Sequence, residues 1–215
     1  MPNNVITRIV AEPPKQLYAE MGIKSEIDDT TRFFRAWMDK PLQVGAIAPS
    51  SAALARAIAN EVDVDSIGPV IELGPGTGAV TEALVEHGIL PDRLVLVEFN
   101  PVFCEMLRAR YPKALIVEGD AYDLIQHLET CPISAASAVV SGLPLYARTV
   151  ERRVSLLRQA FKLLAPGAPF IQFTYAVTSP IPRQTPKVIS HGSTRIWLNL
   201  PPARIWTYRD ASRIA

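Results

Sequence analysis

The chain has little cysteine and no long hydrophobic stretch, and these two deficits exclude several classes of protein. Cys104 and Cys131 are the only cysteines among 215 residues, too few for a disulfide framework and without the paired spacing of a zinc site. We therefore expect a reducing, cytoplasmic compartment. No run of about 18 apolar residues occurs, and no basic start leads into an apolar stretch, so neither a membrane-spanning helix nor a signal peptide is expected.

The chain also has almost no excess of charge of either sign. The formal net charge is only +1, which gives no overall electrostatic case for binding nucleic acid. The distribution is uneven, because residues 181–215 hold six Lys or Arg against one acidic residue. This basic end is expected either to face anionic lipid or a phosphate group, or to be an ordinary solvated edge.

Apolar runs alternate with helical patterns along most of the chain, which favours a doubly wound α/β fold with a mostly parallel seven-stranded sheet. The last two strands have no helix between them and predict an antiparallel C-terminal hairpin. Residues 178–193, rich in Pro and polar side chains, are expected to form an exposed loop. Strands are expected near residues 70–73, 94–97, 115–117, 135–140, 169–175, 195–200 and 203–208. Helices are expected at residues 52–61, 79–87, 101–110, 122–128 and 149–164.

Residues 1–43 are predicted to be an amphipathic helical extension, and residues 44–215 the main domain. Within the extension, Phe33, Phe34, Trp37 and Met38 fall on one face of a helix over residues 30–40, with Arg35 on the other. Such a face fits a helix at a membrane surface. It fits equally well a helix packed on its own domain, and both hold if the helix closes over a site.

A glycine-rich turn after the first strand is the main candidate for ligand binding. Gly74, Gly76 and Gly78 allow a tight turn and close approach of backbone to a ligand. The third glycine comes one residue early for a dinucleotide fingerprint. Glu72, two residues before the first glycine, would repel a pyrophosphate and favour the amino group of a methionine moiety. The turn therefore favours S-adenosylmethionine over a nicotinamide dinucleotide.

Three further strand ends carry side chains suited to the same ligand, because ligands of such sheets bind at the carboxyl ends of the strands. Glu98 follows Gly78 by twenty residues and is placed to accept hydrogen bonds from ribose hydroxyls. Asp120 is placed to accept from an adenine amine. Residues 141–146 follow the fourth strand, where a reacting group would meet the cofactor. No His shows a metal or catalytic-triad pattern.

This combination resembles the class I S-adenosylmethionine-dependent methyltransferases, whose hallmark Glu-x-Gly-x-Gly-x-Gly matches residues 72–78, over about residues 44–175. The resemblance implies S-adenosylmethionine as cofactor, S-adenosylhomocysteine as product, and no metal. The cofactor-binding residues that it implies are Ala46, Ile47, Glu72, Gly74, Pro75, Gly76, Thr77, Gly78, Glu98, Phe99, Asn100, Gly119, Asp120, Ala121 and Ser141.

A narrower resemblance, to the bacterial phospholipid N-methyltransferases of the rhizobial type, rests on four segments: residues 33–41, 44–51, 141–144 and 197–202. It implies stepwise methylation of phosphatidylethanolamine to phosphatidylcholine at the inner face of the bacterial cell membrane, with peripheral attachment to anionic lipid. The catalytic residues implied are Ser141, Gly142, Leu143 and Tyr146. The membrane or headgroup contacts implied are Phe33, Phe34, Arg35, Trp37, Arg183, Lys187 and Arg195.

Two alternative functions stay open. The phospholipid enzymes are similar to ribosomal RNA adenine dimethyltransferases, which carry Asn-Leu-Pro-Tyr after the fourth strand. Here that motif lacks both its Asn and its Tyr, although Tyr146 lies nearby, so no nucleic acid is expected as partner. A non-catalytic membrane-binding protein that has kept the fold is the other alternative, and the intact acidic set Glu72, Glu98 and Asp120 argues against it.

Overall fold

The computed structural model describes residues 52–129, 131, 133, 135–197, 199 and 202–213. The predicted N-terminal extension and its helix over residues 30–40 lie outside the described residues. Within the described ranges, no helix is long and apolar enough to cross a bilayer.

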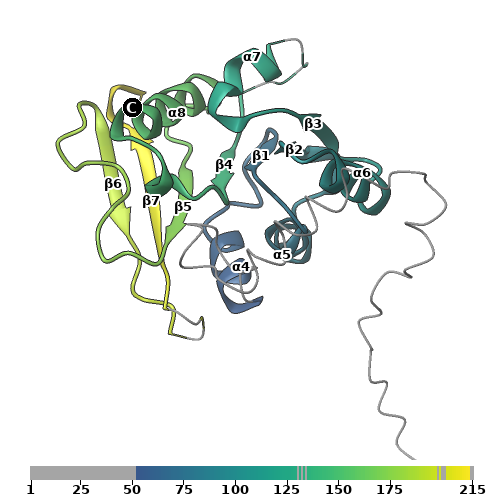
Figure 1. Cartoon of the computed structure of the whole chain (residues 1–215), viewed down its shortest axis with the longest axis horizontal. Helices are drawn as coiled ribbons and strands as arrows, with labels where there is room; N and C mark the ends of the chain where they lie inside the picture. The colour runs from purple at the N-terminus through teal and green to yellow at the C-terminus, as the bar shows by residue number, and fades with distance from the viewer. Residues whose placement is uncertain are drawn as a thin grey trace, which may run out of the picture. The chain divides into compact units, whose positions relative to one another are not determined.

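The described residues form a seven-stranded sheet in the order β3-β2-β1-β4-β5-β7-β6 (Figure 1). β1 to β5 are parallel to one another, whereas β7 runs antiparallel to both β5 and β6. This confirms the predicted mostly parallel sheet with an antiparallel C-terminal pair. The strands are β1 (Val70–Leu73), β2 (Leu94–Glu98), β3 (Leu115–Glu118), β4 (Ala138–Ser141), β5 (Phe170–Thr174), β6 (Val188–Gly192) and β7 (Arg204–Asp210).

Helices cover both faces of this sheet, with α4 and α5 on one face and α7 and α8 on the other (Figure 1). Local signals set their ends: the Asn100 side chain accepts a hydrogen bond from the Val102 amide at the start of α6, and Thr149 caps α8 through the Arg152 amide. The α-helices are α4 (Ala52–Ala59), α5 (Ala79–His87), α6 (Pro101–Arg110), α7 (Leu124–Leu128) and α8 (Val150–Leu163). Short 3₁₀ turns are η1 (Pro91–Arg93), η2 (Ala121–Asp123), η3 (Leu145–Ala147) and η4 (Ala211–Arg213).

The central strands are buried along their whole length, as expected for a parallel sheet with helices on both sides. Every residue of β1, β2, β4 and β5 is buried. One core cluster includes Ile71 and Leu73 of β1, Leu157 of α8 and Phe170 of β5. This core fixes the carboxyl ends of β1, β2 and β4 relative to one another, and those ends carry the candidate site.

The C-terminal hairpin differs from the predicted one. Residues 178–193 were expected to be a loop and residues 195–200 a strand, but β6 lies at Val188–Gly192, inside the predicted loop. The predicted strand contributes only an isolated bridge between Ile196 and Ala203 among the residues that the structure describes. β6 is an edge strand whose three central residues are exposed, so its side chains carry no alternating apolar signal from which a strand is recognised.

Candidate active site

The three glycines of the turn after β1 all adopt the left-handed backbone conformation, with φ of 69° at Gly74, 55° at Gly76 and 82° at Gly78. Residues with a side chain rarely adopt this conformation. A Cβ added at Gly76 would meet no atom of the described residues within 4 Å, so these residues leave space for a ligand there. Pro75 and Thr77 complete it, with the Gly78 amide donating to the Pro75 carbonyl at 2.9 Å.

The Glu98 carboxylate connects this turn to the next strand end. Its Oε2 accepts a hydrogen bond from the Gly76 amide and its Oε1 accepts one from the Asn100 amide, both at 2.9 Å. Glu98 is only 7% exposed, yet each carboxylate oxygen has a further lone pair for a ribose hydroxyl. The backbone around Gly76 and the side chain of Glu98 are therefore held in one arrangement before any ligand arrives.

Glu72, at the third position of β1, is buried against α5. The Thr81 hydroxyl of α5 donates to Glu72 Oε2 at 2.7 Å, and Glu72 is buried. Burial raises the pKa of Glu72 to about 7, and the nearby Glu98 charge adds to the rise while the Thr81 hydrogen bond opposes it. Glu72 is not among the residues that line the cavity described next, and its predicted attraction for a methionine amino group stays a prediction.

A cavity of about 420 Å³ lies where the ends of β1, β2, β3 and β4 meet. It brings together six of the predicted cofactor residues: Gly74, Glu98, Phe99, Gly119, Asp120 and Ala121. Phe99 is 75% exposed, which is unusual for a large apolar side chain and fits a wall that a ligand would cover. The Asp120 side chain accepts from the Tyr122 amide at 2.9 Å.

The sequence interpretation missed part of the cavity wall. Tyr122, Ala147 and Arg148 also line the cavity, and the Arg148 guanidinium lies 5.1 Å from the centre of the Tyr122 ring. Tyr122 directly follows the Gly-Asp-Ala segment, which is a usable signal. Arg148 lies in an exposed segment with no periodic pattern, so no feature of the sequence marks it.

The loop after β4 packs closely against the glycine turn. The Gly142 amide donates to the Leu73 carbonyl at 2.8 Å, and a Cβ at Gly142 would lie 2.8 Å from the Gly74 carbonyl oxygen. The Leu143 carbonyl accepts from the Leu145 amide at 2.9 Å and from Gln172 Nε2 at 3.1 Å. Among the described residues, no loop or turn amide donates to the Gly142 carbonyl.

Ser141 and Tyr146 occupy different surroundings within the same segment. Ser141 is buried at the end of β4 and accepts a long hydrogen bond, 3.4 Å, from the Leu143 amide. Tyr146 is 46% exposed, and its hydroxyl lies within hydrogen-bonding distance of both the Thr178 carbonyl and its side-chain hydroxyl. Tyr146 is not among the residues that line the cavity.

Three of the predicted membrane and headgroup contacts, Arg183, Lys187 and Arg195, lie among the described residues. Lys187 and Arg195 lie beyond opposite ends of β6, Lys187 at the end of the sheet where β5 begins. Arg195 lies beside Trp197, 5.9 Å from the ring centre, and Trp197 is 73% exposed. Arg183 falls in the segment between β5 and β6. The other predicted membrane contacts, Phe33, Phe34, Arg35 and Trp37, lie outside the described residues, as do the predicted cofactor residues Ala46 and Ile47.

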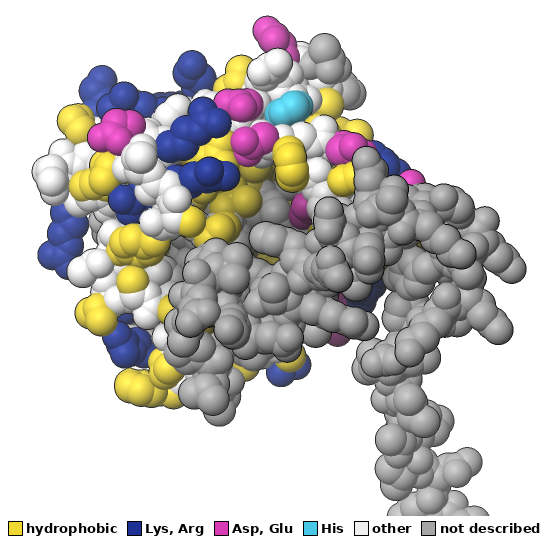
Figure 2. Space-filling model, viewed as in Figure 1, with side chains coloured by type: hydrophobic (Ala, Val, Ile, Leu, Met, Phe, Trp, Pro, Cys, Tyr) yellow, Lys and Arg dark blue, Asp and Glu magenta, His cyan; other side chains and the backbone are white. Residues whose placement is uncertain are grey.

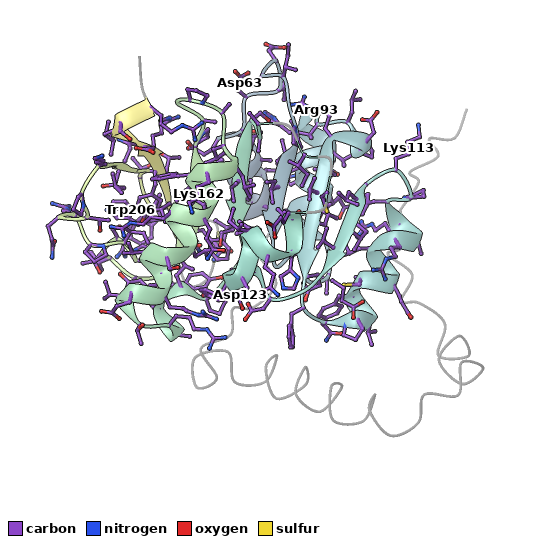
Figure 3. The ribbon with its side chains drawn as sticks, turned by 90° about the horizontal axis from the view of Figure 1, so that it is seen from above. Asp63, Arg93, Lys113, Asp123, Lys162 and Trp206 are labelled. Carbon is purple, nitrogen blue, oxygen red and sulfur yellow. The ribbon has the colours of Figure 1, made fainter. Side chains whose placement is uncertain are left out.

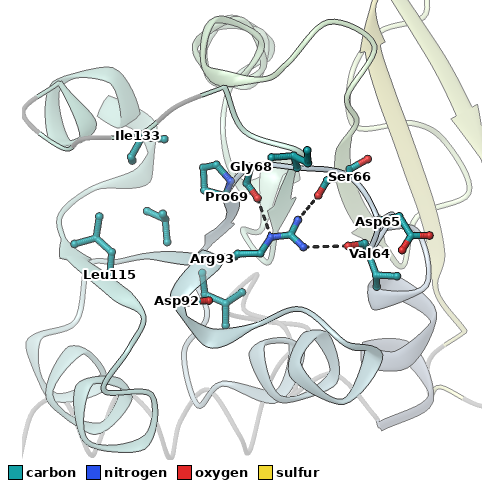
Figure 4. Close-up of a pocket in the computed structure, with 12 residues that line it drawn as sticks. Val64, Asp65, Ser66, Gly68, Pro69, Asp92, Arg93, Leu115 and Ile133 are labelled. Carbon is teal, nitrogen blue, oxygen red and sulfur yellow. Dashed lines mark hydrogen bonds between the residues drawn. The ribbon is translucent and has the colours of Figure 1, made fainter.

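A second cavity, of about 690 Å³, lies at the other end of the parallel strands. Figure 3 shows Asp63 and Arg93 at this end and Asp123 at the opposite one. Arg93 donates to the carbonyls of Val64, Ser66 and Gly68 at 2.6 to 3.0 Å (Figure 4). Because the guanidinium donors are engaged by the backbone, Arg93 holds the loop that enters β1 and offers no free cation to a ligand.

Comparisons with known proteins agree with this geometry. Residues 50–149 match the family model described as ribosomal RNA adenine dimethylase. An ornithine lipid N-methyltransferase of Singulisphaera acidiphila is 36% identical over 135 residues, which are 61% of this chain and 70% of that protein. A ribosomal RNA small subunit methyltransferase A of Maridesulfovibrio salexigens is 37% identical over 70 residues, 33% of this chain but only 26% of that protein.

Among solved structures, a TehB-like methyltransferase of Corynebacterium glutamicum shares the fold, with a TM-score of 0.54 and 10% identity over 85% of this chain and 98% of that one. Together these findings define a class I S-adenosylmethionine-dependent methyltransferase. The chain belongs to the same family as the Singulisphaera ornithine lipid N-methyltransferase. The site fits the cofactor, because Gly76 leaves open space beside the turn and Glu98 and Asp120 present carboxylates along the cavity.

Proposed function

We propose that this methyltransferase methylates the amine of a membrane lipid headgroup. The proposed substrates are phosphatidylethanolamine and its mono- and dimethyl derivatives, and the final product is phosphatidylcholine. The observation that supports a lipid acceptor most strongly is the 36% identity over 135 residues with a protein named for methylating ornithine lipid. Phosphatidylethanolamine and ornithine lipid share a primary amine near an anionic group. The choice between them rests on the resemblance of the segments before α4 and after β4 to phospholipid enzymes.

The chain's part in this reaction is mainly positioning. S-adenosylmethionine supplies an activated methyl group on a sulfonium sulfur, and a neutral amine displaces S-adenosylhomocysteine from it in line. Gly76, Glu98 and Asp120 hold the cofactor along the strand ends. The Gly142 carbonyl, adjacent to the turn, accepts an N–H of the incoming amine and directs its lone pair toward the methyl group.

The amine must release a proton to the solvent before it can attack, since a primary ammonium resembles Lys, with a pKa of about 10.4 in water. Leu143, Pro144 and Ala147 give the cavity an apolar wall on the side of the β4 loop. Transfer of the headgroup into such surroundings disfavours its charged form and lowers the pKa of the amine. Each methylation then removes one N–H, so a trimethylated product loses its hydrogen bond to the Gly142 carbonyl and leaves readily.

Peripheral contact with the inner face of the membrane is part of this proposal. Figure 2 shows Lys and Arg side chains over the part of the surface that α8, β6 and β7 occupy. α8 alone carries Arg152, Arg153, Arg158 and Lys162. Near the end of β5, Val177 is 65% exposed, and the exposed Trp197 lies beside Arg195. Exposed apolar side chains next to cations fit the surface of an anionic bilayer.

Vesicles containing phosphatidylethanolamine, vesicles containing ornithine lipid and methyl-labelled S-adenosylmethionine test the proposal directly. The products are extracted and separated by headgroup and by the number of methyl groups. We expect label in mono-, di- and trimethylated phosphatidylethanolamine. Label in ornithine lipid alone would identify ornithine lipid as the substrate instead. If the protein binds the cofactor but labels neither lipid, a lipid acceptor is refuted.

Ribosomal RNA adenine is a second candidate acceptor, because the matching family model is that of the ribosomal RNA adenine dimethylases. The match, residues 50–149, spans the cofactor half and ends at the start of α8. The near-neutral charge and the absence of the Asn and Tyr of the family's loop motif disfavour it. Label transferred to ribosomal RNA and not to lipid, under the same conditions, would establish this function instead.

A further inference from the structure

Three buried polar atoms without a hydrogen-bond partner lie on adjacent strands. They are Gln172 Oε1 of β5, Arg204 Nε and Trp206 Nε1 of β7. In the β5–β7 register, Gln172 is opposite Trp206 and Thr174 is opposite Arg204. Directly opposed residues, and residues two apart on one strand, point to the same face of a sheet. The three unpaired atoms therefore belong to side chains that share one face and are immediate neighbours.

The orientation of the Gln172 amide is determined by its surroundings. Its Nε2 lies 3.1 Å from the Leu143 carbonyl oxygen and 2.7 Å from the Phe173 carbonyl oxygen. Because both partners are acceptors, only the NH₂ group of the amide can face them. The opposite end is then necessarily the carbonyl oxygen, and Gln172 presents a buried acceptor with nothing bound to it.

Arg204 and Trp206 supply donors beside this acceptor. The Arg204 guanidinium carbon lies 5.9 Å from the centre of the Trp206 ring, and no ion pair to Arg204 is found among the described residues. Trp206 is 5% exposed, and its ring packs against Gly192 of β6, where a Cβ would lie 3.0 Å from it. A cation and an indole N–H thus stand next to a free amide oxygen.

The cluster lies next to the β4 loop, where the proposed function places methyl transfer. Gln172 is the register partner of Ser141 at the end of β4, and it holds the carbonyl of Leu143, whose side chain lines the cofactor cavity. Buried polar groups of folded proteins nearly always have partners. Three unpaired ones at this position call for a ligand with one donor and with acceptor oxygens.

We propose that Gln172, Arg204 and Trp206 form the headgroup subsite of the acceptor lipid, a site for an amine that carries a nearby anionic group. Gln172 Oε1 accepts from the substrate N–H, and Arg204 and Trp206 donate to the anionic oxygens. This inference rests on the proposed lipid N-methyltransferase function and extends it to headgroup recognition. The anionic group is a phosphate in phosphatidylethanolamine and a carboxylate in ornithine lipid, and the same three groups suit both.

Two substitutions test the subsite with little change of shape. Trp206→Phe removes the indole N–H and keeps an aromatic ring, and Arg204→Met removes the charge and keeps the stem. The matched control is Arg56→Met, which removes the same charge from an exposed position of α4. Calorimetry on the full chain loaded with S-adenosylhomocysteine measures the binding of two soluble headgroups, glycerophosphoethanolamine and Nα-acetylornithine. The Kd for S-adenosylhomocysteine itself is measured in parallel.

We expect at least one of the two headgroups to bind, and both substitutions to weaken its binding at least tenfold. The Kd for S-adenosylhomocysteine should stay within twofold of wild type in both variants, and the Arg56→Met variant should bind headgroup and cofactor within twofold of wild type. The headgroup that binds identifies the source of the anion. Binding of neither headgroup to the wild-type protein, or equal losses for headgroup and cofactor, would overturn the subsite. This binding measurement needs no turnover and is therefore independent of the vesicle assay. If lipid is labelled in that assay but neither substitution changes the KM for lipid, the proposed function is supported and this subsite is refuted.

Discussion

Glu98 Oε2 accepts a hydrogen bond from the amide of Gly76, 22 positions earlier in the chain, at 2.9 Å. The other oxygen of the same carboxylate binds the Asn100 amide at the start of α6. One side chain therefore fixes the open point of the glycine turn, the end of β2 and the first turn of the next helix. The proposed cofactor site is therefore organised in the absence of a ligand, which would reduce the ordering that binding must bring about.

Replacement of Glu98 by Gln tests this organisation. The NH₂ group of the Gln side chain would face the backbone N–H of either Gly76 or Asn100, so one hydrogen bond would be lost. The other hydrogen bond would remain but would no longer have a charged acceptor. Hydrogen bonds to charged groups contribute about 1.5–3 kcal/mol, so we expect S-adenosylmethionine to bind about 10- to 100-fold more weakly in calorimetric titration. The control is Glu118→Gln, which changes the exposed register partner of Glu98 on β3. Equal affinity in wild type and Glu98→Gln would contradict the role assigned to the carboxylate.

The sequence predicted the elements with strong local signals. α5 and α6 begin and end where expected, because a glycine turn precedes one and an Asn-Pro start precedes the other. The continuous apolar runs of β1, β2 and β4 correspond to strands buried on both faces. β6 was missed because three of its five residues are exposed at a sheet edge, where tertiary pairing with β7 decides the structure and composition does not.

The candidate site was predictable only in its local part. The acids and glycines at the strand ends follow one another within short motifs, and parallel topology brings those ends together. The pairing of Leu143 with Gln172, 29 positions later, depends on the register between β4 and β5 and on a side-chain orientation. No spacing in the sequence encodes that register, so the occupied Leu143 carbonyl became visible only in the structure.

Gly142 has no room for a side chain. A Cβ at this position would lie 2.8 Å from the Gly74 carbonyl oxygen, a backbone atom that cannot rotate away. We expect Gly142→Ala to displace the glycine turn at a cost of about 1–3 kcal/mol in stability and to weaken the binding of S-adenosylmethionine. Denaturant unfolding and calorimetric titration measure the two effects.

The matched control is Gly167→Asn, in the turn before β5. Gly167 has φ of 76° and no atom within 4 Å of an added Cβ, and Asn tolerates this conformation better than other residues with a side chain. We expect this variant to lose little stability and no affinity for the cofactor. If Gly142→Ala bound the cofactor as tightly as the control, close packing of the two loops would not matter for the site.

Glu72 makes the stability of the protein depend on pH near neutrality. Burial raises the pKa of Glu72 from 4.5 to about 7 in the folded protein, so the folded state binds more protons than the unfolded state between these values. The stabilisation by the protonated form is fully present below pH 4.5 and is lost as the pH rises through about 7. The difference corresponds to at most about 3 kcal/mol.

Urea unfolding between about pH 5 and pH 8, which covers most of the range between the two pKa values of Glu72, measures this pH dependence of stability. We expect Glu72→Gln to remove this part of the pH dependence and to be more stable than wild type at the upper end, since its amide is never ionised and still accepts from the Thr81 hydroxyl. Glu86→Gln, on the exposed side of α5, should retain the wild-type dependence. Parallel curves for wild type and Glu72→Gln would show that Glu72 does not titrate in this range.

Arg93 offers a way to separate stability from cofactor binding. Its guanidinium binds the carbonyls of Val64, Ser66 and Gly68 at the end of the sheet away from the glycine turn (Figure 3). Arg93→Met would leave these part-buried carbonyls without donors, so we expect a loss of about 2–4 kcal/mol in unfolding free energy. The affinity of the folded protein for S-adenosylmethionine should stay within twofold of wild type. Lys113→Met removes a charge from an exposed position and should change neither quantity, whereas a loss of cofactor affinity in Arg93→Met alone would mean that the two ends of the sheet are coupled.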